Sequence, residues 1–172
     1  MRSDFFSRRI AAPFGVPFFL RLFLAALFCA SLNASAADDV STQLLVGSDF
    51  KSAHDALIET IEAEGLVVSA VIPFNGMLAR TAKDLAQEAS PFAEAEIVQF
   101  CSSVLAWQMV TEDAAQLSLC PLSIAIYAKA AEPGKVMLAY RSPGRGSPAR
   151  ARGDDLLRRV VARAAELARL RW

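Results

Sequence analysis

Two cysteines, Cys101 and Cys120, are the residues whose type and spacing are best suited to chemistry. A pair of thiols can close a disulfide, cycle between thiol and disulfide states, or bind a soft metal ion. Each cysteine borders a segment that is predicted to be a β-strand, so a bond between them would join two strands. We expect a structural disulfide, because the chain carries the features of an exported protein. Closing a loop of this length is worth about 3 kcal/mol in the chain-entropy picture.

The alternative is a redox or soft-metal site made by the same two cysteines. No Cys-x-x-Cys spacing is present and no cation adjoins either thiol, which argues against a thioredoxin-like site. Zinc would have His54 as its only imidazole ligand. No cofactor is predicted, and the alternative is copper(I), which could be bound by two thiolates with Met77 or Met109 in addition.

His54 is the single histidine of the chain. It falls at the helical spacing of Phe50, Leu57 and Ile61, which favours a structural role at the edge of a buried helix face. A catalytic nucleophile would need a base beside it, and His54 with Cys101 is the only conceivable pair. We therefore expect a domain that is not an enzyme.

Several large side chains could line an apolar pocket for a small ligand, or could simply belong to the core. These candidate pocket residues are His54, Met77, Trp107, Met109, Tyr127 and Tyr140.

The amino terminus reads as a targeting segment. Four arginines precede an uncharged apolar run over residues 22–32, and Ala34-Ser35-Ala36 offers a small-x-small cleavage pattern. This order predicts a signal peptide over residues 1–36, cleaved near Ala36 or Ala37. The third cysteine, Cys29, would be removed with it. The mature protein is expected in the periplasm or outside the cell.

The net charge of zero hides an asymmetry along the sequence. Residues 37–140 carry five basic and fourteen acidic side chains, whereas residues 141–172 carry nine arginines and three acidic side chains. An acidic body argues against nucleic acid as a partner, since phosphate binding needs clustered Lys and Arg. The basic end could pack on its own domain, complete a dimer, or contact an anionic membrane.

Periodicity and turn residues predict a domain over residues 37–141, a basic linker over 142–153 and an amphipathic helix over 154–172. Strands are expected at residues 41–46, 66–72, 94–100, 121–128 and 136–140. Helices are expected at 49–64, 76–88 and 102–112, and a hairpin turn at 132–135. The order predicts an α+β fold in which an antiparallel-rich sheet of about five strands has its helices on one face, in strand-helix-four-strands-helix order.

Several of these segments together resemble the family called domain of unknown function 302. The segments that carry the resemblance are residues 65–67, 77–82, 99–102, 119–127 and 136–141. The resemblance covers about residues 44–143 and implies a compact α+β domain that often forms dimers. It implies no agreed activity and no catalytic residues. Because Cys101-Ser102 stands where many relatives have a glycine-rich turn, the chain resembles a cysteine-bearing, exported branch.

The functional expectation follows from these observations. We expect an exported, non-enzymatic domain, held by a disulfide, that binds a small apolar or sulfur-containing ligand or a partner protein, and that forms a homodimer. The alternative is a periplasmic redox or copper-binding protein that uses Cys101 and Cys120.

Overall fold

The computed structural model describes residues 40–46 and 49–171, and residues 38–172 form one compact unit. The predicted signal peptide lies outside the described residues. The strands are β1 (Val40–Val46), β2 (Val67–Ile72), β3 (Phe92–Cys101), β4 (Leu122–Lys129) and β5 (Lys135–Arg141). The helices are α2 (Phe50–Ala63), α3 (Phe74–Thr81), α4 (Ser103–Glu112) and α5 (Pro148–Arg169), with short 3-10 helices η1 (Lys83–Leu85) and η2 (Ala114–Leu119).

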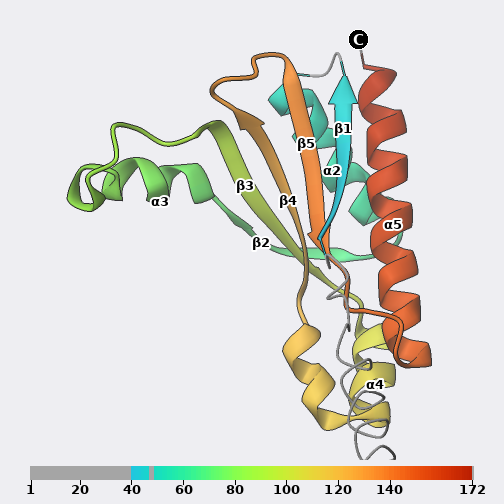
Figure 1. Ribbon diagram of the computed structural model, residues 1–172. Coiled ribbons are helices and arrows are strands. Elements are labelled where there is room, and N and C mark those ends of the chain that lie inside the picture. Colours follow the sequence, from blue (N-terminus) through green and yellow to red (C-terminus); the bar gives the residue numbers. More distant parts are fainter. Residues whose placement is uncertain (1–39, 47–48, 172) are drawn as a thin grey trace, which may run out of the picture. The chain divides into compact units, whose positions relative to one another are not determined.

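The five strands form one antiparallel sheet in the order β1-β5-β4-β3-β2 (Figure 1). The last four strands follow each other along the sheet, and β1 joins at the far edge beside β5. This arrangement confirms the predicted α+β class. The expected hairpin turn is confirmed at residues 130–134, where Gly134 has a positive φ of 77° between β4 and β5.

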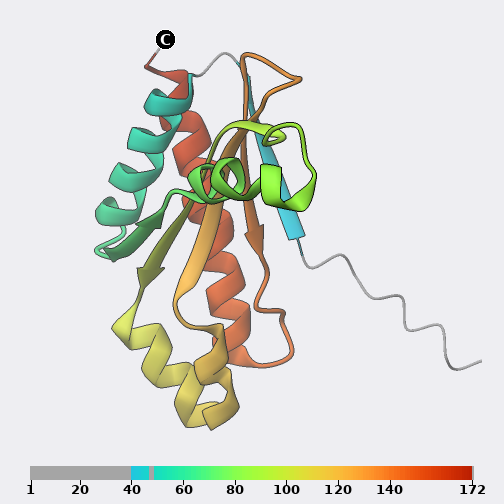
Figure 2. The same cartoon turned by 90° about the vertical axis from the view of Figure 1, so that its left-hand side faces the viewer.

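Side chains alternate between the two faces of the sheet, and one face forms the core with α2 and α5. Phe100, Ile124, Ile126 and Leu138 point to this face and have no exposed surface. The buried stripe of α2 packs on the same core and on α5. Figure 2 shows the opposite face of the sheet, with α2 and α5 lying behind it.

The helix α3 departs from the prediction that all helices lie on one face. It lies in front of the upper sheet in Figure 2, on the side away from α2 and α5. The side-chain amide of Asn75 ties it to β3 by donating to the carbonyl oxygen of Ala93 at 2.8 Å. It ends at Thr81, and the predicted helix over 76–88 continues only as the short η1.

The predicted linker over residues 142–153 is wrong in its second half, because α5 begins at Pro148. Ser147 caps the helix by accepting from the backbone N–H of Arg150, and proline at the first helical position needs no partner for an N–H. Gly153, which reads as a linker residue, is buried where α5 meets α4. No helix within the described part of the chain is both long and apolar enough to cross a membrane.

The apolar stripe of α5 is buried within the same unit. Leu157, Val160 and Ala164 on this stripe have no exposed surface. Several outward arginines of α5 pair with carboxylates; Arg163, for example, lies 2.6 Å from Glu64, the residue after α2. The structure therefore shows the first of the three roles expected for the basic helix, packing on its own domain.

Candidate functional site

The two cysteines lie close together at the α4 end of the sheet. Cys101 ends β3, and Cys120 lies between η2 and β4. Because Phe100 pairs with Leu122, both cysteines fall at the same end of the β3–β4 ladder. Cys101 is exposed, Cys120 is half-buried, and both thiols are free in the structure. Burial raises the pKa of Cys120, and the neighbouring Cys101 raises it further.

The structure therefore brings the predicted pair together without the predicted bond between them. The disulfide, redox and copper alternatives stay predictions for these two residues. Met77 lies on α3 and Met109 is fully buried in α4. Among the described residues, no three His, Cys, Asp or Glu side chains are grouped to hold a metal ion.

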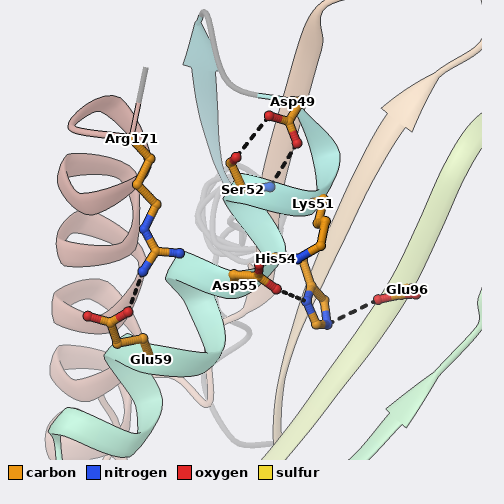
Figure 3. Close-up of polar contacts among 8 residues, drawn as sticks. All are labelled: Asp49, Lys51, Ser52, His54, Asp55, Glu59, Glu96 and Arg171. Carbon is orange, nitrogen blue, oxygen red and sulfur yellow. Dashed lines mark hydrogen bonds and ion pairs between the residues drawn. The ribbon is translucent and has the colours of Figure 1, made fainter.

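His54 lies on α2, between two carboxylates (Figure 3). Its Nε2 lies 3.4 Å from Glu96 Oε2 on β3, and its Nδ1 lies 3.4 Å from Asp55 Oδ1. The pKa of Asp55 is lowered, mainly by a hydrogen bond from Lys51 and to a smaller extent by one from His54. Glu96 and Cys101 are five residues apart on one extended strand, about 16 Å at the usual rise. The His54–Cys101 pairing considered from the sequence is therefore not formed.

The six candidate pocket residues do not share a pocket. Met109 and Tyr140 are buried in the core, whereas Trp107 is 73% exposed on α4. Tyr127 packs edge-on against Phe92, with 5.4 Å between ring centroids. Of the six, only Tyr140 lines one of the hollows described below.

One hollow lies on the sheet face opposite α2 and α5, which we call the open face. Ala125 of β4 pairs with Ala139 of β5 on one side and with Ile97 of β3 on the other. These three residues form a row across the strands, and two of them have small side chains. The row beside it carries the larger Tyr127 and Met137. The result is a shallow apolar hollow of about 190 Å³, the open-face groove, lined by Val40, Ile97, Ser123, Ala125, Ala139, Tyr140 and Arg141.

A second, more polar hollow adjoins this groove and shares Ser123 and Arg141 with it. The β4–β5 ladder ends at Ile124 and Tyr140. The segment before β4 comes from η2, and the segment after β5 leads to α5, as Figure 2 shows. Residues of both segments line a cleft. This cleft of about 520 Å³ is the arginine pocket, lined by Ser118, Leu119, Pro121, Leu122, Ser123, Arg141, Ser142, Pro143 and Arg150.

A third hollow, of about 420 Å³, lies at the other end of the sheet, beside the β4–β5 hairpin and the start of α2. Its cationic groups already have a carboxylate partner, and one of its carboxylates caps a helix. Lys129 and Lys135 both bind Glu132, at 2.9 and 3.2 Å, and Asp49 caps α2. The arginine pocket differs because its cationic groups have no carboxylate partner among the described residues.

Arg141 and Arg150 are therefore the site residues that sequence reasoning missed. The sequence shows a basic end but not which of its nine arginines are neutralised by folding. Proximity of the end of β5 to η2 and to the start of α5 depends on tertiary structure. The break in the β4–β5 pairing has no local sequence signature apart from Pro121, which directly precedes β4, and Pro143, which comes shortly after β5.

The fold and the hollows together define a small α+β domain in which α2 and α5 cover one face of the sheet and α3 lies over only the upper part of the other. The chain belongs to the family described as Domain of unknown function DUF302, whose sequence profile matches residues 42–167. This match confirms the resemblance and extends it, because α5 is part of the shared domain. The predicted limit near residue 143 was therefore wrong.

A solved structure gives the same fold. The chain is similar to an uncharacterised conserved DUF302 protein from Bacillus stearothermophilus, with 15% identity and a TM-score of 0.56. The alignment covers 77% of this chain and 99% of the other. No curated protein matches the sequence.

Proposed function

We propose that this protein is an exported, non-enzymatic domain that binds a small ligand with an apolar part on its open face. The observation that carries the proposal is the apolar groove over Ala125 and Ala139, on a sheet face that α2 and α5 leave uncovered. The adjoining arginine pocket extends the available volume into the range of known ligand sites. Burial of an apolar ligand surface there would supply about 25 cal/mol per Å².

The proposal is tested with Nile red, a neutral apolar dye, and residues 38–172 of the protein. Binding in the groove is expected to increase and blue-shift the dye's fluorescence. Ala125→Leu and Ala139→Leu fill the groove and should weaken dye binding about tenfold, which corresponds to about 1.4 kcal/mol. Ala162→Leu, on the exposed surface of α5, is the matched control and should bind as the parent does.

Two results would contradict this function. One is the absence of dye binding by the parent protein. The other is unchanged binding in both filled variants while the control is also unchanged. Light scattering of the same samples shows whether a second copy covers the open face instead, because the leucine variants would then change the dimer and not the dye signal.

A second candidate function is favoured by the two free thiols at one end of the sheet. In this case Cys101 and Cys120 would cycle between thiols and a disulfide, or bind copper(I). Thiol titration of denatured protein with and without reductant distinguishes the states. Two thiols without reductant, together with copper(I) binding that Cys101→Ser removes, would support the metal site. A stable disulfide with no metal uptake would support a structural link.

A further inference from the structure

Ion pairs neutralise most arginines at the basic end of the chain, and the few arginines without a carboxylate partner indicate where an anion could bind. Of its nine arginines, six lie within ion-pair distance of a carboxylate: Arg145, Arg152, Arg158, Arg159, Arg163 and Arg171. Within the described part of the chain, Arg141, Arg150 and Arg169 have no such partner. Two of these three, Arg141 and Arg150, line the same pocket.

The guanidinium group of Arg150 is held in place by the loop that precedes α5. Its Nε donates to the carbonyl oxygen of Pro143 at 2.5 Å, which leaves its Nη groups for other partners. Gly144 has a φ of 80°, and a Cβ built on it would lie 2.5 Å from Arg150 Nη2. Glycine at this position therefore permits both the turn and the position of the guanidinium group.

The lining of the arginine pocket is suited to an anion. It contains two guanidinium groups and the hydroxyl of Ser123, and its described lining includes no carboxylate. The other two lining serines already donate their hydroxyl protons, Ser118 to the carbonyl oxygen of Ala115 and Ser142 to Asp154. Arg150 is half-buried, and a half-buried cation without a counter-charge gains from binding one. Asp154 and Asp155, on the same helix, are occupied by Arg145.

The pocket opens into the apolar groove, because Ser123 and Arg141 line both hollows. We propose that the ligand is an amphiphilic carboxylate whose head binds between Arg141 and Arg150 and whose apolar chain lies in the open-face groove. This inference rests on the ligand-binding function proposed above and adds the chemical class of the ligand. Charge complementarity at one end and small apolar side chains at the other determine its orientation.

The test compares three probes of equal chain length, used below their micelle concentrations: decanoate, decanol and decyltrimethylammonium. Each competes with Nile red for residues 38–172. Decanoate is expected to bind at least tenfold more tightly than decanol, and the cationic probe more weakly than both. Added sodium chloride should weaken decanoate binding and leave decanol binding unchanged.

Single-residue variants test which side chains cause the preference for decanoate. Arg141→Gln and Arg150→Gln should each reduce the preference for decanoate over decanol, measured as the ratio of the two affinities. Gly144→Ala should do the same by displacing the Arg150 guanidinium group. Arg169→Gln removes an arginine that also lacks a carboxylate partner among the described residues but lies outside both hollows. It is the matched control and should have no effect.

The outcomes separate the two proposals. Equal binding of decanoate and decanol by the parent protein would overturn the carboxylate proposal while the groove remains a ligand site. Unchanged selectivity in both arginine variants would overturn it as well. If neither the dye nor decanol binds, the proposed function itself fails. Circular dichroism of each variant confirms that the fold is retained before binding is compared.

Discussion

At the scale of single residues, the carboxylate of Asp154 accepts hydrogen bonds from three side chains. Asp154 is 4% exposed and accepts hydrogen bonds from Ser142 Oγ at 2.7 Å, Arg145 Nη1 at 2.9 Å and Arg158 Nη2 at 2.6 Å. Burial alone would raise the pKa of Asp154, but the three hydrogen bonds outweigh it and the pKa is lowered overall. The residue therefore links the loop after β5 to the start of α5, beside the arginine pocket.

Replacing Asp154 should destabilise the protein in a pH-dependent way. Asp154→Ala is expected to lower the free energy of unfolding by about 2 kcal/mol at pH 7, because its donors lose a charged acceptor. Since folding lowers this pKa, the stabilisation is present above the ordinary value of 3.8 and is lost as the pH falls through the folded value. Urea unfolding at pH 7 and below pH 4 measures both effects. Asp155→Ala, which removes a more exposed partner of Arg145, should lower the free energy of unfolding much less. Equal losses in the two variants would contradict the larger contribution of Asp154.

The two thiols should react at different rates. Cys101 is exposed, whereas burial both shields Cys120 and raises its pKa, so less thiolate is present at a given pH. Iodoacetamide at pH 8 is expected to modify Cys101 first in the reduced protein. Mass spectrometry after digestion identifies the site, and Cys101→Ser should remove the fast phase. Equal rates at the two cysteines would contradict this order.

At the scale of elements, the strands and α2 could be predicted because their signals are local. The β-branched run at residues 66–72 and the apolar spacing of α2 each depend on short sequence windows. Three features could not be predicted in this way. The η2 helix has no periodic pattern, and α3 takes its face from contacts with β3. The start of α5 was hidden because Gly153 and Pro148 are typical of a linker.

The site was predicted only in part, for a related reason. Cys101 and Cys120 could be placed together because each borders a predictable strand. The pocket residues could not be assigned to a face, since Trp107 and Met109 lie on one helix yet one is exposed and the other buried. The pairing state of each arginine depends on which carboxylates the folded chain brings near it.

Gly153 should be intolerant of a larger side chain. A Cβ at this position would lie 2.8 Å from Met109 Cε and 3.2 Å from Pro143 Cγ. Gly153→Val is therefore expected to push α4 and the loop after β5 away from α5, at about 1–3 kcal/mol. Thermal unfolding measures the change. Ala162→Val on the exposed side of α5 measures the cost of a valine in this helix without a close contact, and a Gly153 variant as stable as this control would refute the close packing.

At the scale of the whole molecule, α5 completes the core and is not an appendage. It buries ten residues against α2, α4 and the sheet. A chain ending at residue 147 should therefore lose cooperative unfolding, whereas residues 38–172, which form one compact unit, should unfold cooperatively. Circular dichroism during urea titration compares the two. Cooperative unfolding of the shorter chain would show that the sheet and α2 suffice.

The position of β1 has a consequence for the time course of folding. Strands β2 to β5 can pair in the order in which they are made, because each lies beside the next. Strand β1, however, pairs only with β5, in a register that joins Val40 to Arg141. A chain that emerges amino terminus first must keep β1 unpaired until residue 141 is available, and such distant pairings slow folding. Although β1 is the first of the described strands to be synthesised, it cannot enter the sheet before β5 does.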